Sequence, residues 1–388
     1  MHALPNYFDL IVVGGGVLGT FHAFHALNKG LKVALFEKNN TPIDATVRNF
    51  GQIVPSGMNA KWQAYGRKSL EIYQSIQAKT DIGISQNGSI YLASDEDELQ
   101  LIAELHHINQ QNHYPSQLLS AAQCVKKYPS LNTDYCKGGL FFEQELSANP
   151  RVMIGRLQQY LAQNKDFFHF PGTLITATEA TGSQCRVRSS NGNIWYGGKV
   201  LICSGSDFKT LFPQLFQQSD LQTVKLQMLR LMPQRHTRLP GNILTGLSIR
   251  RYESFSECPS YKSIKEKENA NTFWKKWGIH ILFKQEEDGS IILGDSHEYA
   301  DAAYADTLSF DLREDVNQYF IDEGKKIFHL EHWNIDTQWA GFYSQGKQHD
   351  IYLHSPDTNL HIITGIGGKG MTGSAGFALE NITNLLGT

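Results

Sequence analysis

The pattern of apolar and polar residues differs between the N-terminal part of this chain and its later part. Residues 10–13 form a continuous apolar run, which predicts a strand buried on both faces of a parallel sheet. Residues 17–27 then place apolar side chains at helical spacing, and residues 32–36 form a second apolar strand. From about residue 224 to residue 294 the pattern changes to short strand-like pieces. The pattern therefore predicts a strand–helix–strand unit first and an inserted antiparallel sheet later.

Other segments complete this outline. The sequence predicts helices over 60–80, 95–111, 150–164 and 311–328, and strands over 88–93, 138–142, 173–179, 185–189, 200–203 and 360–364. Within the later sheet we expect strands over 227–232, 243–252, 277–284 and 290–293, interrupted by a charged, helix-prone stretch over 263–274. Residues 39–55 are too polar and too broken for a strand, so a loop is expected there.

The first turn of the N-terminal unit carries a glycine fingerprint, G-x-G-x-x-G, at Gly14, Gly16 and Gly19. Gly14 allows a tight strand-to-helix turn, Gly16 leaves room for a pyrophosphate, and Gly19 lets helix and strand pack closely. Glu37 ends the second strand, where a carboxylate accepts hydrogen bonds from an adenosine ribose and repels a 2′-phosphate. The pattern predicts a dinucleotide site that disfavours NADP, the alternative being a tight turn without a ligand.

The composition argues against a nucleic-acid-binding protein, a membrane protein and a metalloprotein. The 388 residues suffice for about two domains, and the net charge of −3 gives no reason to expect nucleic acid or an anionic membrane as a partner. No apolar run of about 18 residues suggests a membrane span, and residues 1–7 lack a signal-peptide pattern, so a cytoplasmic protein is expected. The five scattered cysteines and the 15 histidines show no metal-ligand spacing, so no metal site is expected.

A second glycine-rich strand–turn–helix pattern lies near the C-terminus. The predicted strand over 360–364 runs into the glycine-rich residues 365–372, and apolar residues at helical spacing follow. Such a loop brings backbone N–H groups and a helix N-terminus against the N1–C2=O edge of a flavin, where negative charge gathers on reduction. A nicotinamide has no comparable need. The two glycine motifs together favour FAD, whereas the second alone also fits a connection to a packing helix.

With these motifs in place, nearly the whole chain resembles the D-amino-acid oxidase, glycine oxidase and sarcosine oxidase family of FAD-dependent amine oxidoreductases. The resemblance rests on the two glycine motifs with Glu37, on the turn Ser204-Gly205-Ser206, and on Trp339-Ala-Gly341. It implies an α/β fold in which a discontinuous Rossmann-like FAD-binding domain carries an inserted α+β substrate domain built on an antiparallel sheet. It also implies non-covalent FAD, because no cysteine or histidine stands where the family attaches flavin.

Four stretches make the chain similar to a branch of this family associated with aminophosphonate breakdown. They are Val47-Arg-Asn-Phe-Gly51, Leu226-Gln-Met-Leu-Arg230, Arg251-Tyr252 with Phe255, and Gly294-Asp-Ser-His-Glu-Tyr299. This resemblance implies oxidation of the C–N bond of 2-aminoethylphosphonate, or of an N-methylated relative, to phosphonoacetaldehyde. Hydride would pass from the α-carbon to flavin N5, leaving an imine that water hydrolyses.

One departure from the family pattern concerns the substrate. Members that oxidise amino acids usually carry an arginine two residues after Ala-Gly, where this chain has Tyr343 in Ala340-Gly-Phe-Tyr-Ser344. A phenol cannot form the bidentate, charge-assisted pair that a guanidinium forms with a carboxylate. Either another cation holds the substrate anion or the substrate is not an α-amino acid. A glycine- or sarcosine-type oxidase and a dinucleotide-binding scaffold without turnover remain as alternatives.

Candidate substrate-site residues come mainly from the inserted sheet. Arg250, Arg251 and Tyr252 fall on the strand expected over 243–252, where alternation lets only one arginine face the flavin. The resemblance favours Arg251, the alternative being a solvated arginine. His280 and His297 are candidates for accepting the ammonium proton or holding a phosphonate, and each also fits a satisfied core histidine.

The expected site residues fall into three groups. The expected catalytic residues are His280, His297 and Lys369, and the expected substrate-binding residues are Arg48, Arg251, Tyr252, His297 and Tyr343. Lys369 also fits a solvated loop lysine, and Arg48 also fits a residue that holds its loop together. The expected FAD-binding residues are Val13, Gly14, Gly16, Val17, Leu18, Gly19, Glu37, Lys38, Arg48, Asn49, Phe50, Gly51, Gln52, Ile175, Ser204, Gly205, Gly341, Gly367, Gly368, Lys369, Gly370, Met371 and Thr372.

The expected domain limits follow from the same reasoning. Residues 1–85, 145–220 and 335–388 would form the FAD-binding domain, and residues 86–144 and 221–334 the substrate domain. The expected partners are a small amine substrate and oxygen or another electron acceptor.

Overall fold

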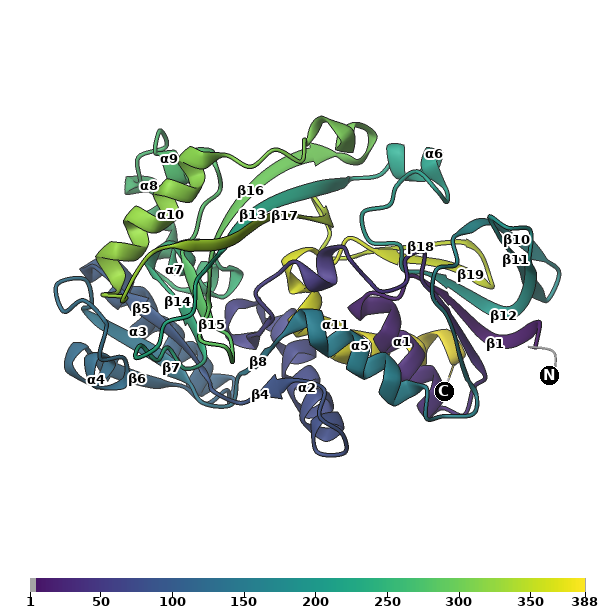
Figure 1. Cartoon of the computed structure of the whole chain (residues 1–388), viewed down its shortest axis with the longest axis horizontal. Helices are drawn as coiled ribbons and strands as arrows, with labels where there is room; N and C mark the ends of the chain where they lie inside the picture. The colour runs from purple at the N-terminus through teal and green to yellow at the C-terminus, as the bar shows by residue number, and fades with distance from the viewer. Residues whose placement is uncertain (1–4, 388) are drawn as a thin grey trace.

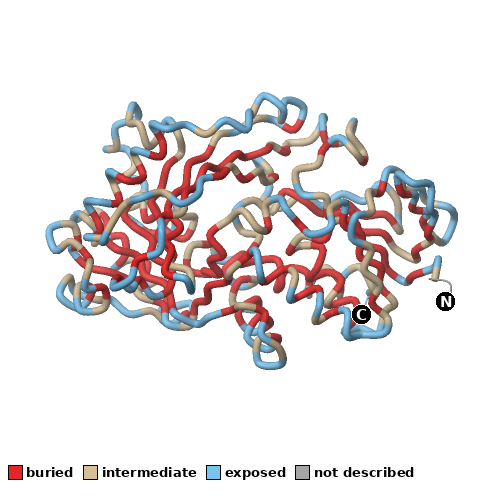
Figure 2. Tube along the Cα trace, viewed as in Figure 1, coloured by how far each residue is buried: buried red, intermediate tan, exposed pale blue. Residues whose placement is uncertain are grey.

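The computed structural model describes residues 5–387; residues 1–4 and 388, which the expected domain limits include, lie outside this range. Two large sheets form two halves of the molecule, joined in the middle by helices and loops (Figure 1). Exposed residues gather in the outer loops, whereas the central strands of both sheets are largely buried (Figure 2). Within residues 5–387, no helix is both long and apolar enough to cross a lipid bilayer.

The first sheet contains the predicted parallel strands. Its strand order is β10-β11-β12-β1-β2-β9, and β19 pairs with β12 and carries β18. β1 pairs in parallel with β12 and β2, so the carboxyl ends of these strands meet at one edge. The strands are β1 (Tyr7–Val13), β2 (Val33–Phe36), β9 (Phe167–Phe170), β10 (Ile175–Thr181), β11 (Gln184–Ser189), β12 (Ile194–Ile202), β18 (Tyr352–Asp357) and β19 (Leu360–Thr364).

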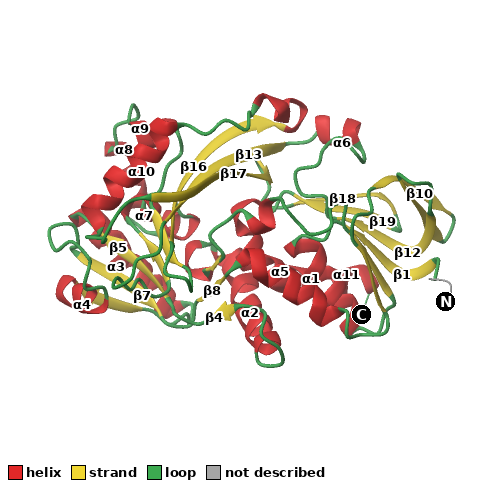
Figure 3. Cartoon of the chain, viewed as in Figure 1, coloured by secondary structure: helices red, strands yellow, loops and turns green. Residues whose placement is uncertain are grey.

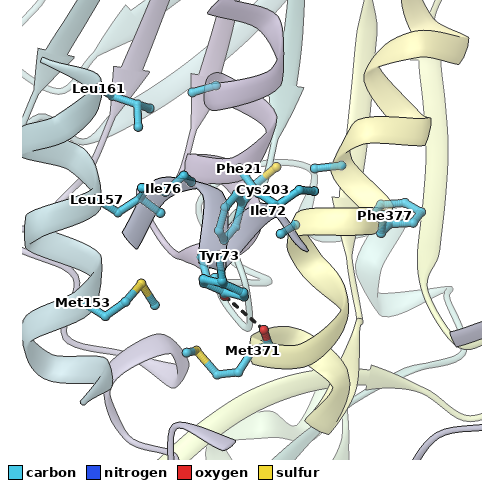
Figure 4. Packing of buried hydrophobic residues seen from close by; sticks show 14 of the residues in the cluster. Phe21, Ile72, Tyr73, Ile76, Met153, Leu157, Leu161, Cys203, Met371 and Phe377 are labelled. Atoms are coloured by element: carbon cyan, nitrogen blue, oxygen red, sulfur yellow. Dashed lines mark hydrogen bonds between the residues drawn. The ribbon is translucent and has the colours of Figure 1, made fainter. Parts of the chain in front are cut away.

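Four helices pack beside this sheet (Figure 3): α1 (Val17–Asn28), α2 (Ala60–Gln77), α5 (Pro150–Leu161) and α11 (Gly370–Leu386). α11 contacts both α1 and α2, which brings the C-terminal helix against the N-terminal one. Figure 4 shows Phe21, Tyr73, Leu157 and Met371 in the shared apolar cluster, where Tyr73 Oη donates to Met371 O at 3.0 Å. This core therefore fixes the two glycine motifs relative to each other.

The second sheet is antiparallel except for one pair. Its order is β17-β13-β16-β15-β14-β5-β7-β6, and only β14 and β5 run parallel among the described strands of this sheet. The strands are β5 (Ser89–Ala93), β6 (Gln117–Ser120), β7 (Gly138–Phe142), β13 (Leu221–Leu231), β14 (Asn242–Leu244), β15 (Leu282–Gln285), β16 (Ile291–Asp301) and β17 (Ile335–Gly346). The predicted α/β fold with an antiparallel substrate sheet is confirmed in these two sheets.

A small third sheet and short helices complete the chain. The small sheet has the order β3-β8-β4, with β3 (Gln52–Ile53), β4 (Ile84–Ser85) and β8 (Leu146–Ala148). The other helices are α3 (Glu96–Gln111), α4 (Ala121–Lys127), α6 (Pro213–Gln217), α7 (Gly246–Ile249), α8 (Tyr261–Lys267), α9 (Phe273–Lys276) and α10 (Glu314–Ile327). Five 3-10 turns are η1 (Ala45–Val47), η2 (Pro55–Gly57), η3 (Glu253–Glu257), η4 (Ala302–Thr307) and η5 (Gly367–Lys369).

Two expectations about the elements of the second half are wrong, and the expected domain limits stay a prediction. The strand expected over 243–252 ends at Leu244, because Thr245 Oγ1 donates to Ile281 O and the chain turns into α7. A side chain at Gly246 would overlap the Glu98 carboxylate, so the turn needs this glycine. The helix expected over 263–274 is split into α8 and α9. The domain limit at residue 335 falls at the start of β17, which pairs with β13 in the second sheet.

Candidate functional site

A cavity of about 580 Å³ lies where the two halves meet, and a smaller one of about 110 Å³ lies at the carboxyl end of β1. The two share the wall formed by Gly16, Thr46, Cys203 and Gly205. They therefore lie next to each other along the edge where the parallel strands end, which is where open α/β sheets bind ligands.

The smaller cavity is built from the N-terminal fingerprint. Gly14 has a φ of +111°, and a β-carbon there would overlap the carbonyl of Cys203, so only glycine allows β1 to turn this closely past β12. Glu37 Oε2 accepts from Gly15 N at 3.0 Å, which holds the carboxylate beside the loop. The expected FAD-binding residues on this cavity are Val13, Gly14, Gly16, Glu37, Lys38, Ile175, Ser204 and Gly205.

The larger cavity brings the other expected FAD-binding residues together. They line it as follows: Gly16, Val17, Leu18, Arg48, Asn49, Phe50, Gln52, Gly205, Gly341, Gly367, Gly368, Lys369, Gly370, Met371 and Thr372. Within residues 5–387, the lining of neither cavity includes Gly19 or Gly51. A side chain at Gly19 would overlap Gly14 O, and one at Gly51 would overlap Ala148 O, so both residues serve close packing.

The walls fit a flavin in two respects. Gln52 lines the larger cavity, and within residues 5–387 its buried Nε2 has no hydrogen-bond partner, which leaves an amide donor for a ring oxygen or nitrogen. A β-carbon on Gly368 would have open space around it, and α11 begins two residues later. Backbone N–H groups and the positive end of a helix therefore border the cavity.

Arg48 and Lys369 line the larger cavity with their charged groups already bound. Arg48 Nε donates to Ile43 O at 2.6 Å and Nη1 to Ala340 O at 3.1 Å, which ties the loop before β3 to β17. Lys369 Nζ lies 2.6 Å from Glu253 Oε1 and 3.2 Å from Asp350 Oδ1. Lys369 thus links the glycine loop to η3 of the other half.

The two neighbouring arginines have different environments. Both follow α7 on a loop, so the expected strand alternation does not apply. Arg250 pairs with Glu98 at 2.8 Å, Asp95 at 2.6 Å and Glu268 at 3.4 Å, away from the larger cavity. Arg251 lines that cavity, donating through Nη2 to Tyr299 Oη at 2.9 Å and through Nη1 to Gly278 O.

Three ionisable groups meet on the wall beside Arg251. His280 Nε2 lies 2.7 Å from Asp295 Oδ1, and His297 Nε2 lies 3.9 Å from Asp295 Oδ2. Burial lowers the pKa of His280, and it lowers the pKa of His297 to about 3, so both rings are neutral at pH 7. Burial disfavours ionisation of Asp295, but the two histidines and Arg251 outweigh it and hold the pKa of Asp295 below its ordinary value.

Sequence reasoning placed His280 and His297 in the site but missed Asp295 and Thr46. Asp295 precedes His297 by two residues on β16, and the period of a strand puts both on the same face, so this signal was available. His280 precedes β15 rather than lying on a strand, and His297 lies within β16 rather than at its end. Thr46 Oγ1 accepts from Val17 N at 3.0 Å, a contact that nothing in the sequence indicates.

Tyr252 and Tyr343, which were expected to bind the substrate, also line the larger cavity. Tyr343 lies on β17 with its ring 6.4 Å from that of His297, and the ring of Tyr252 lies 5.5 Å from that of His280. Burial raises the pKa of both phenols, so they stay neutral at physiological pH. This part of the wall therefore combines the cation Arg251 with neutral aromatic groups and the carboxylate of Asp295.

Known proteins of similar sequence and structure agree with this geometry. The mouse mitochondrial sarcosine dehydrogenase is 26% identical over 151 residues, which is 38% of this chain and 16% of that protein's length. Glycine oxidase from Geobacillus kaustophilus has a similar fold, with a TM-score of 0.76 at 15% identity over 98% of this chain and 95% of the other. The L-α-glycerophosphate oxidase from Mycoplasma pneumoniae, solved with FAD bound, has a TM-score of 0.76 at 18% identity over 98% and 95%.

A family model settles the cofactor. The model described as DAO, FAD dependent oxidoreductase, matches residues 9–380 and so includes both glycine motifs and the whole larger cavity. FAD, expected from the sequence, is therefore confirmed as the cofactor of this chain. The chain belongs to this family of FAD-dependent oxidoreductases.

Proposed function

We propose that the protein oxidises the C–N bond of a small amine that carries a phosphonate, most simply 2-aminoethylphosphonate or its N-methyl derivative, to phosphonoacetaldehyde. The observation that carries this proposal is the position of Arg251, whose guanidinium lies on the wall of the larger cavity. A phosphonate is a compact dianion, and arginine is well suited to bind it. The relatives named for glycine and sarcosine support an amine as the oxidised group.

The residues of the cavity would divide the work between binding and proton handling. Bound FAD supplies the hydride acceptor, and water hydrolyses the imine left on the substrate. Arg251 would hold the phosphonate while Tyr252 and Tyr343 form apolar walls with neutral hydroxyls. The neutral ring of His297 would take up a proton, because only an unprotonated amine gives up hydride readily. Oxygen or another acceptor would reoxidise the cofactor.

Tyr343 supports a phosphonate rather than an α-amino acid. It stands where the family's amino acid oxidases usually carry a carboxylate-binding arginine, and it is buried against His297 and Tyr252. The cation on this wall is instead Arg251, on the loop that follows α7. A glycine- or sarcosine-type oxidase remains the second candidate, since Arg251 can also pair with a carboxylate.

Anaerobic reduction of the bound flavin tests the proposal directly. The holoenzyme is mixed with 2-aminoethylphosphonate, its N-methyl derivative, glycine or sarcosine, and the absorbance of oxidised flavin is followed. We expect rapid bleaching with a phosphonate and slow or no bleaching with the amino acids. Bleaching by the amino acids alone would refute the phosphonate proposal, and the absence of bleaching with every amine would favour a scaffold without turnover.

Replacing Arg251 by alanine should raise the KM for the phosphonate about 100-fold and change kcat much less, because a charge-assisted contact of this kind contributes about 2–3 kcal/mol. Steady-state kinetics measures both constants. Arg186→Ala is the matched control, since Arg186 lies on β11 and pairs there with Glu179 on the neighbouring strand. An unchanged KM in the Arg251 variant would show that another group holds the anion.

A further inference from the structure

The carboxylate of Asp295 is the most unusual charged group on the cavity wall. Asp295 is only 7% exposed, and within residues 5–387 its Oδ1 has no hydrogen-bond donor. His280 Nε2 lies 2.7 Å from this oxygen and helps to lower the pKa of the carboxyl. A buried, ionised carboxylate that lacks a donor is costly unless a ligand supplies one.

The second oxygen faces another free acceptor. His297 Nδ1 lies 3.0 Å from Gly278 O, and since a carbonyl can only accept, Nδ1 carries the proton of the neutral ring. His297 Nε2, which then carries the lone pair of the ring, lies 3.9 Å from Asp295 Oδ2. His297 Nε2 and Asp295 Oδ2 are both acceptors, so a hydrogen-bond donor or a cation between them would satisfy both.

The 3.9 Å distance between His297 Nε2 and Asp295 Oδ2 suits a bound ammonium better than a metal ion. A nitrogen at ordinary hydrogen-bond distance from both acceptors would subtend an angle of roughly 90°, which two N–H bonds of an ammonium accommodate. A metal ion at about 2.1 Å from both would require roughly 140°, far from tetrahedral geometry. Arg251 beside the cluster further disfavours a multivalent cation, even though the ligand atoms of His280, Asp295 and His297 all lie within 4.8 Å of one another.

We propose that Asp295 and His297 form the amine-binding end of the substrate site, where His297 Nε2 accepts a proton from the substrate ammonium. This inference rests on the proposed oxidation of an amine. In the step, one N–H bond of the ammonium breaks and the N–H bond at His297 Nε2 forms. Asp295 keeps its negative charge and stabilises the imidazolium, while the amine keeps its lone pair for the oxidation.

Gly278 connects this end of the site to the anion-binding end. Its carbonyl accepts from His297 Nδ1 and also from Arg251 Nη1, so the two ends are adjacent. A substrate that reaches both must carry its amine and its anion only a few bonds apart. The site therefore fits short zwitterions, and it would discriminate against amines without an anion and against anions without an amine.

Other ionisable groups surround His297 and bear on its protonation. They are Asp295 and Tyr299 on β16, His280 before β15, Arg251 and Tyr252 after α7, and Tyr343 on β17. Arg251 and His280 oppose a positive charge on His297, while Asp295 favours it. Binding of a phosphonate to Arg251 offsets this opposing charge and so raises the pKa of His297 when the anion is in place.

Ligand binding to the dithionite-reduced holoenzyme tests the role of Asp295 without turnover. Calorimetry under anaerobic conditions compares 2-aminoethylphosphonate with ethylphosphonate, which lacks the amine. Asp295→Asn should raise the Kd of the amine about 30-fold and that of ethylphosphonate less than about 3-fold, as expected for loss of one charge-assisted contact. Ser296→Ala is the matched control, because Ser296 lies between the two residues on β16. An equal increase in the Kd of both ligands would overturn the proposal. So would a stoichiometric metal ion that only the wild type retains.

The pH profile of kcat/KM tests the role of His297. His297→Asn keeps a donor near Gly278 O and removes Nε2. Below the pKa of the substrate amine, kcat/KM of the wild type should vary little with pH. In the same range, kcat/KM of the variant should fall about tenfold for each unit by which the pH is lowered, because the variant depends on substrate that is already unprotonated. If kcat/KM of the wild type and of His297→Asn depended on pH in the same way, the proposed proton transfer to His297 would be refuted. If phosphonates fail to bind at all, glycine and acetate provide the same comparison, so that the amine site is judged separately from the choice of anion.

Discussion

A Gly14→Ala variant should lose FAD on purification and unfold at a much lower temperature than the wild type. The new β-carbon would overlap Cys203 O at a φ of +111°, so β1 and β12 would have to separate at their carboxyl ends. Backbone strain and overpacking together cost on the order of 3–5 kcal/mol. The ratio of flavin to protein and the thermal unfolding of the apoprotein measure the two effects.

Two further variants separate folding from cofactor binding. Gly16 has an ordinary φ of −67°, and its β-carbon would approach only Thr46 Oγ1, at 3.0 Å. Gly16→Ala should therefore retain the apoprotein fold and lose FAD, because the methyl group enters the wall shared by both cavities. Gly155→Ala on α5 has open space around the new carbon, so it should keep FAD and gain slightly in stability. Full FAD retention in both Gly14→Ala and Gly16→Ala would contradict the assignment of this turn.

A Glu145→Gln variant should gain stability relative to the wild type as the pH rises from 5 to 8. Glu145 is fully buried, and its Oε1 accepts from Ser56 N at 2.8 Å and from Tyr114 Oη at 2.9 Å. Within residues 5–387, Oε2 has no partner. Burial raises the pKa of Glu145 from 4.5 to about 7, despite these hydrogen bonds.

The direction of the pH effect depends on whether the folded or the unfolded chain holds the proton of Glu145. Between pH 4.5 and about pH 7 the folded chain keeps Glu145 protonated while the unfolded chain releases the proton. The contribution of Glu145 to the free energy of unfolding therefore falls as the pH rises through this window, by roughly 3 kcal/mol in total. Glutamine preserves the acceptor for Ser56 and Tyr114 and cannot ionise. Urea unfolding of both proteins at pH 5 and pH 8 isolates the contribution, because other groups titrate alike in each.

Glu143→Gln provides the control for this experiment. Glu143 is exposed two residues before Glu145, so its replacement should leave the pH dependence of stability as it is in the wild type. A Glu145→Gln variant with the same pH dependence as the wild type would mean that this carboxyl is ionised in the fold.

The sequence by itself determined the parts of this protein that depend on local pattern. The apolar run before Gly14, the glycines that follow it and Glu37 predicted the dinucleotide turn, because each residue acts on neighbours close along the chain. The glycine loop before α11 was likewise evident from its composition. Their pairing into one site was an inference from chemistry, and the shared core around Tyr73 explains why it holds.

Only the tertiary structure decided which polar groups share the larger cavity. Arg250 and Arg251 are adjacent in sequence, yet one binds three carboxylates and the other lines the cavity, because α7 replaces the expected strand. Asp295 and His280 meet because β15 and β16 are neighbours in the sheet. Such contacts depend on the pairing of segments far apart along the chain, and the sequence pattern of either segment carries no record of its partner.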